Sequence, residues 1–142
     1  MIQDIYFDKY DWSVRIYYII EDYLDSILLD LQDLGCPEEE MLRAKYNITS
    51  KYKNAGFIFS NPIYKESLIV IGPTDSAEEF QNTLDHEKGH LATHIALYYN
   101  INPYGEEFQY LNGTIGREIF KQAKFLMCDE CRNKIITASE GV

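Results

Sequence analysis

The sequence predicts a small α+β domain in which an antiparallel or mixed sheet packs on helices. Strand-like segments dominate the first half of the chain, and long segments of helical periodicity dominate the second half. Such a separation of strands from helices is typical of α+β folds. With 142 residues, 46% hydrophobic and 14% aromatic, the chain can bury one substantial core. We therefore expect a single domain over residues 1–142, in which residues 123–142 form a C-terminal tail.

The first elements are two strands followed by two helices. Residues 2–7 are rich in aromatic and β-branched side chains, and Trp12 to Ile20 alternates apolar with other residues as a half-buried strand does. Asp22 to Leu34 changes to helical spacing and stops before Gly35, a residue that favours helix ends. Pro37, which is favoured in a first turn, predicts a second short helix that reaches about Tyr46.

Two further strands and two helices complete the chain. The strands are predicted at Gly56–Ser60 and Ser67–Ile71, joined as an irregular hairpin, and we expect the second to be an exposed sheet edge. Ser76 and Glu79 have the spacing of a capping box, which predicts a helix from there to about Asn100. Asn102-Pro103 then predicts the start of the last helix.

Charge and cysteine content exclude several classes of partner. The net charge is −10, so the chain lacks the basic surface that phosphate backbones require, and we expect no nucleic-acid partner. Eight acids without a base fall between Glu21 and Glu40, which indicates a solvated helix face. No segment has the ~20 apolar residues of a membrane span. The N-terminus has no signal-peptide pattern, and three cysteines predict reduced thiols in a cytoplasmic protein. The Cys128–Cys131 pair lacks two further ligands at zinc-site spacing.

The motif His86-Glu87-Lys88-Gly89-His90 lies in the middle of the capped helix. Residues four apart share a helix face, so the two imidazoles can converge on one zinc ion. Glu87 falls within the apolar stripe and should point inward, where a carboxylate is costly unless a cation or bound water compensates it. An HExxH helix is the pattern of two zinc ligands with a glutamate as general base. The motif therefore predicts one zinc ion bound by His86 and His90.

His94 and the acids of the last helix are the candidates for further roles at this site. His94 lies eight residues after His86, about 12 Å along a helix, so it cannot share their zinc and is expected to serve the core or to support the ligands. Glu107 lies beside the inward stripe of the last helix and is preferred as third ligand over Glu106 and Glu118. This requires the two helices to cross at an angle, because a tight antiparallel hairpin would place residues near Asn112 beside His90.

The runs HEKGHLATHIA and PYGEEFQYLNG resemble gluzincin-type metallopeptidases of the zincin family, in which a glutamate on the following helix completes a His2Glu zinc site. The run ESLIVIG before the motif helix is similar to small zincin-like proteins that prophages of gut bacteria encode. The resemblance covers roughly residues 66–120 and implies His86, His90 and Glu107 as ligands, with Glu87 as the base. No NExxSD follows the motif helix, unlike in thermolysin-like enzymes.

The resemblance implies a cytoplasmic zinc metallopeptidase that hydrolyses a peptide or protein substrate with a zinc-activated water. The strand Ser67–Ile71 could bind that peptide by strand addition, and Tyr104 or Tyr110 could stabilise the oxyanion. The alternative is a non-catalytic protein, for instance a phage component, whose zinc stabilises its structure. The substrate's identity and the oligomeric state are not indicated by the residues.

Overall fold

The computed structural model describes residues 1–18, 23–49 and 56–140 and has an α+β fold. Its sheet contains β1 (Ile2–Phe7), β2 (Trp12–Tyr18), β3 (Gly56–Asn61) and β4 (Glu66–Ile71), in the order β1-β2-β4-β3. β1 pairs antiparallel with β2, β2 parallel with β4, and β3 antiparallel with β4. The sheet is therefore mixed. The predicted strand positions Ile19 and Ile20, and the predicted first helix position Asp22, lie outside the described residues.

The edge of the sheet beside the hairpin is β3, so the prediction of an exposed edge at Ser67–Ile71 is wrong. β4 lies between β2 and β3, and five of its six residues are buried. The parallel pairing of β2 with β4 is long-range, because a crossover separates the two strands along the chain. The sequence of the β3–β4 hairpin does not indicate that β2 pairs with β4, so from the sequence either strand of the hairpin could be the edge of the sheet.

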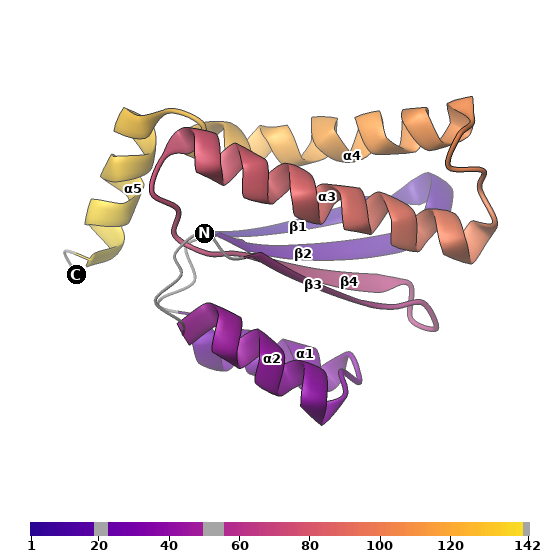
Figure 1. The fold of residues 1–142 in the computed structure, drawn as a ribbon, viewed down its shortest axis with the longest axis horizontal. Coiled ribbons are helices and arrows are strands. Elements are labelled where there is room, and N and C mark those ends of the chain that lie inside the picture. The colour runs from indigo at the N-terminus through magenta and orange to yellow at the C-terminus, as the bar shows by residue number, and fades with distance from the viewer. Residues whose placement is uncertain (19–22, 50–55, 141–142) are drawn as a thin grey trace.

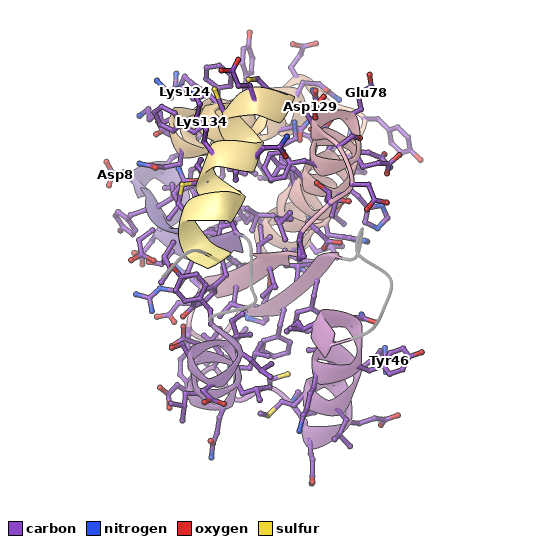
Figure 2. All side chains as sticks on the ribbon, turned by 90° about the vertical axis from the view of Figure 1, so that its left-hand side faces the viewer. Asp8, Tyr46, Glu78, Lys124, Asp129 and Lys134 are labelled. Carbon is purple, nitrogen blue, oxygen red and sulfur yellow. The ribbon has the colours of Figure 1, made fainter. Side chains whose placement is uncertain are left out.

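Helices cover both faces of the sheet and create two cores. α3 (Ala77–Tyr99) and α4 (Glu106–Ala123) lie on one face, whereas α1 (Leu24–Asp33) and α2 (Glu38–Thr49) lie on the other (Figures 1 and 2). In β2, Val14 and Ile16 belong to the core under α3 and α4, and Tyr17 belongs to the core over α1 and α2. The alternation expected for β2 is present, but Tyr17 on the second face is also buried.

The ends of α3 are determined by local capping. The Ser76 hydroxyl accepts a hydrogen bond from the backbone N–H of Glu79 at 3.1 Å, which confirms the predicted cap. The helix ends at Asn100, which adopts the left-handed conformation with φ 56°. Asn102 does not cap the next helix: its side chain accepts the N–H of Tyr104, and α4 begins later, after Gly105. An asparagine side chain that closes a turn competes with helix capping.

The residues predicted as a tail fold back onto the start of α3. A short 3-10 helix, η3 (Lys124–Leu126), places Leu126 in the core, and α5 (Asp129–Glu140) follows. The Asp129 carboxylate accepts a hydrogen bond at 2.8 Å from the backbone N–H of Ala77, which has no partner within α3 because it lies in the first turn. Within the described ranges, none of the helices combines the length and the apolar character needed to cross a bilayer.

Candidate metal centre

His86 and His90 lie side by side on the exposed flank of α3. Their Nε2 atoms are 3.2 Å apart, and their rings meet edge to face with centroids 4.8 Å apart. Two nitrogens bound to one tetrahedral zinc ion at ~2.0–2.1 Å are themselves roughly 3.3 Å apart. The two side chains therefore already have the spacing of two ligands of one zinc ion.

Glu87 is buried between α3 and the edge strand, with 5% of its surface exposed. No hydrogen bond or ion pair joins its carboxylate to another described residue. Burial raises the pKa of Glu87, and the nearby His86 and His90 oppose that increase. The inward position predicted from the apolar stripe is confirmed. An unpaired carboxylate at this depth is costly, so a cation beside it would stabilise it.

The close approach of α3 to β3 depends on Gly56. A Cβ atom at Gly56 would lie 2.8 Å from Cγ2 of Thr83 and 2.9 Å from Cγ of Glu87. The same Cβ would lie 3.0 Å from Oε1 of Glu87, so the carboxylate rests on the glycine backbone. Only glycine leaves room for this contact. The neighbouring residues in the sequence do not indicate that Gly56 has this role.

Glu107 is not brought to the histidines, contrary to the prediction that it is the third ligand. It is the second residue of α4, its side chain is 53% exposed, and its nearest ionic partner is Lys9 at 3.9 Å. Among the residues described, no group of three or more His, Cys, Asp or Glu side chains is placed to hold a metal ion.

The geometry of the helical hairpin places the acids of α4 apart from the histidines. A Cβ atom at Gly116 would lie 3.4 Å from Nζ of Lys88, so the Lys88 side of α3 faces α4. His86 and His90 are each two residues from Lys88, and at about 100° per residue they point roughly 160° away from it. Glu106, also in the first turn of α4, is exposed, and Glu118 pairs with Lys121 and Arg117. α3 and α4 run in opposite directions on the same side of the sheet (Figure 1), and the Lys88–Gly116 contact places the middle of one beside the middle of the other.

His94 continues the line of histidines by one helical turn. Its ring centroid is 6.2 Å from that of His90. Its Nδ1 is 2.7 Å from the Ser60 hydroxyl, which is 2.6 Å from the Ser67 hydroxyl, and Ser67 accepts the indole N–H of Trp12 at 2.9 Å. Burial lowers the pKa of His94, and the charge of His90 adds to this. His94 is thus half-buried and held by polar groups that the sequence alone did not connect with it.

The other side chains considered for the site lie elsewhere. Tyr104 is 93% exposed and Tyr110 is 71% exposed; they lie just before α4 and on it, away from the histidine flank. An oxyanion role for either tyrosine therefore has no geometric basis.

Cys128 and Cys131 are exposed free thiols at the start of α5, where the Cys128 sulfur accepts the N–H of Cys131 at 3.2 Å.

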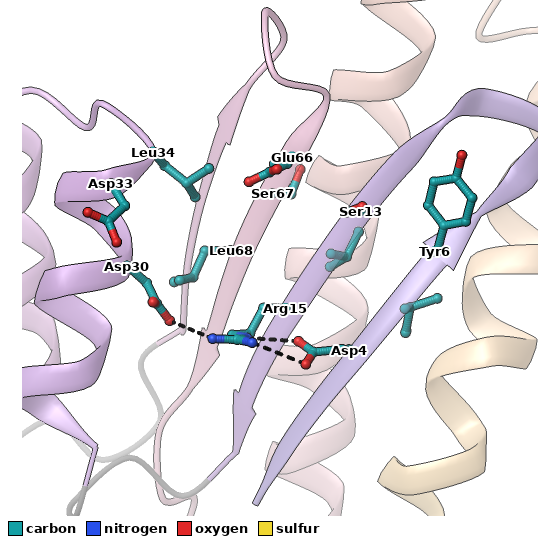
Figure 3. A pocket seen from close by; sticks show the side chains of 12 residues that line it. Asp4, Tyr6, Ser13, Arg15, Asp30, Asp33, Leu34, Glu66, Ser67 and Leu68 are labelled. Atoms are coloured by element: carbon teal, nitrogen blue, oxygen red, sulfur yellow. Dashed lines mark hydrogen bonds and ion pairs between the residues drawn. The ribbon is translucent and has the colours of Figure 1, made fainter.

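A cavity of about 520 Å³ lies on the face of the sheet opposite to α3, beside α1 (Figure 3). Arg15 occupies its centre and forms ion pairs with Asp4 at 2.8 Å and with Asp30 at 3.3 Å. The guanidinium is therefore neutralised by the protein itself. This cavity has no residue in common with the histidine flank of α3.

Comparisons with known protein families, with curated proteins and with solved structures found no match to this chain. The zincin resemblance therefore rests on the HExxH motif and its helical context.

Proposed function

We propose that this chain is a zinc-dependent hydrolase of peptide bonds, with His86 and His90 as metal ligands and Glu87 as general base. The observation that carries the proposal is the 3.2 Å separation of the two Nε2 atoms on the exposed flank of α3. Imidazole nitrogen is a preferred zinc donor. When bound, zinc supplies a Lewis acid that polarises a carbonyl and lowers the pKa of water.

Glu87 would accept the proton of the attacking water. A general base is most effective when its pKa lies near the working pH, and burial raises the pKa of Glu87 in that direction. Its carboxylate is held against Gly56 by close packing rather than by a cationic side chain. A base held in this way stays available, because no described lysine or arginine forms an ion pair with it.

The edge strand β3 supports a peptide as the substrate. It runs under the histidine flank, from Gly56 beneath Glu87 to Ser60 beside His94. In the described part of the sheet, its outer edge has no strand partner. An extended peptide can add to such an edge through backbone hydrogen bonds, which orient it without regard to sequence. The role first expected for Ser67–Ile71 thus passes to β3.

The alternative of a purely structural zinc receives less support. Structural zinc sites are closed by four protein ligands that tie separate segments together. Here both histidines come from one helix and both are exposed. Catalytic zinc sites have three protein ligands and one position open to water. The exposed flank leaves such a position accessible to water and substrate.

The test combines zinc content with hydrolysis of a mixed peptide library by the zinc-loaded protein. Glu87→Gln should retain zinc and lose activity by about 10²-fold or more, because it removes the base and keeps the shape. Glu78→Gln, an exposed acid in the first turn of the same helix, is the matched control and should behave as wild type. Absence of zinc binding, or equal cleavage by wild type and Glu87→Gln, would refute the proposal.

A further inference from the structure

A mainly apolar cavity of about 400 Å³ opens beside the row of histidines on α3, at His94. This volume lies within the ~300–1,000 Å³ range of ligand-binding pockets. Indole, phenol, proline and leucine side chains form most of its walls, and a serine and a histidine contribute the polar atoms. Its lining residues are Trp12, Ser60, Pro62, His94, Leu97 and Tyr98.

The cavity lies one helical turn beyond the metal ligands. His94 lines it and is four residues after His90, with 6.2 Å between their ring centroids. Ser60, near the end of β3, lines it as well. The edge strand therefore leads from the Glu87 carboxylate to the mouth of this cavity.

The spacing matches the repeat of an extended peptide. A zinc ion shared by His86 and His90 would lie midway between them, six residues or about 9 Å along α3 from His94. Two to three residues of an extended chain advance about 7–10 Å. A peptide along β3 whose scissile bond lies at the zinc consequently places a side chain two or three positions away at the cavity.

We propose that this cavity is the specificity subsite of the chain and takes a large apolar side chain, preferably aromatic, two or three residues from the peptide's scissile position. This inference rests on the proposed function, because that function sets where the scissile bond lies. The occupant follows from the cavity's apolar walls and from its continuity with the free edge of β3. Tyr98, whose side chain is 46% exposed, offers an aromatic surface to such a side chain, and the buried Trp12 ring contacts Tyr98 edge to face with the centroids 5.7 Å apart.

The polar side of the cavity fits the backbone of the same peptide. The Trp12 indole can only donate, so the simplest proton arrangement runs from Trp12 to Ser67, then to Ser60 and to Nδ1 of His94. His94 then carries its proton on Nε2, as a donor. The chain of hydrogen bonds fixes the ring, so this N–H is available to a peptide carbonyl while the side chain fills the cavity.

The experiment uses the fluorescence of Trp12, the only tryptophan of the chain. Blocked octapeptides of alanine and serine, with a single phenylalanine or with alanine in its place, are titrated into the protein in the presence of a zinc chelator. Phenylalanine should tighten binding about tenfold or more, because its large apolar side chain leaves water when it enters the cavity. Leu97→Asp should abolish this preference by charging the rim of the cavity at a side chain that is 76% exposed. Leu42→Asp, at a 63% exposed leucine of α2, is the matched control and should retain the preference.

The zinc-loaded protein then separates this inference from the proposed function. Cleavage two or three residues from the phenylalanine supports both. Cleavage with no preference for phenylalanine overturns the subsite and leaves the hydrolase proposal standing. A phenylalanine preference of the zinc-free protein that Leu97→Asp removes, without any cleavage, supports an apolar peptide pocket and refutes the hydrolase. A preference that Leu97→Asp leaves unchanged overturns the subsite.

Discussion

Replacing Gly56 by alanine tests the contact that positions Glu87. The added Cβ would lie 2.8 Å from Cγ2 of Thr83 and 2.9 Å from Cγ of Glu87, so the two buried side chains or the whole of α3 must shift. Overpacking of this kind costs about 1–3 kcal/mol of unfolding free energy. For a chain of this size that corresponds to a decrease in Tm of roughly 3–10 °C. Without the clash, alanine would be the better strand residue, so a loss of stability is attributable to the contact.

The measurement is thermal and urea unfolding followed by circular dichroism. Gly113→Ala is the control, because nothing lies within 4 Å of a Cβ at this position in α4. There alanine should raise stability by about 0.5–1 kcal/mol, as in other helix interiors. Combining Gly56→Ala with Glu87→Ala should reduce the cost, because two of the three closest atoms belong to Glu87. If Gly56→Ala is as stable as wild type, or if Glu87→Ala does not reduce its cost, α3 does not rest on β3 as described here.

Three further predictions concern the metal, the thiols and a buried tyrosine. In competition with a chelating dye, Glu107→Ala and Glu118→Ala should leave the zinc affinity unchanged, whereas His90→Ala should lower it at least tenfold. A comparable loss of affinity in Glu107→Ala would show that α4 does supply a ligand. Cys128 should react with iodoacetamide faster than Cys36, as followed by mass spectrometry. The N–H of Cys131 lowers the pKa of the exposed Cys128 thiol, whereas burial raises the pKa of the Cys36 thiol to about 11. Equal rates would contradict this prediction. Burial and Asp30 raise the pKa of Tyr17 to about 12, so its unfolded form loses the phenol proton first, at about pH 10. Stability should therefore fall as the pH rises from about 10 to 12, and Tyr17→Phe should flatten that fall in urea unfolding; identical profiles would refute it.

Short-range patterns in the sequence were sufficient for most elements of the fold. The Ser76 cap, the apolar stripe of α3 and the inward direction of Glu87 were all predicted, since each depends on residues within a few turns of one helix. The proximity of His86 to His90 is likewise a consequence of helical spacing. Asn102 was misassigned as a helix cap because its side chain can satisfy either a turn or a helix end, and local sequence does not distinguish them.

Features that depend on contacts between distant segments could not be predicted from short-range sequence patterns. The parallel pairing of β2 with β4 decides that β3 is the free edge, and that pairing joins residues more than fifty positions apart. The rotation of α3 against α4 directs Lys88 toward Gly116 and the histidines away from it, which separates Glu107 from them. The sequence by itself determined the HExxH pair and its helix, because helix geometry is local. Only the tertiary structure decided which strand and which cavity lie beside that pair, because those neighbours result from packing across the whole chain.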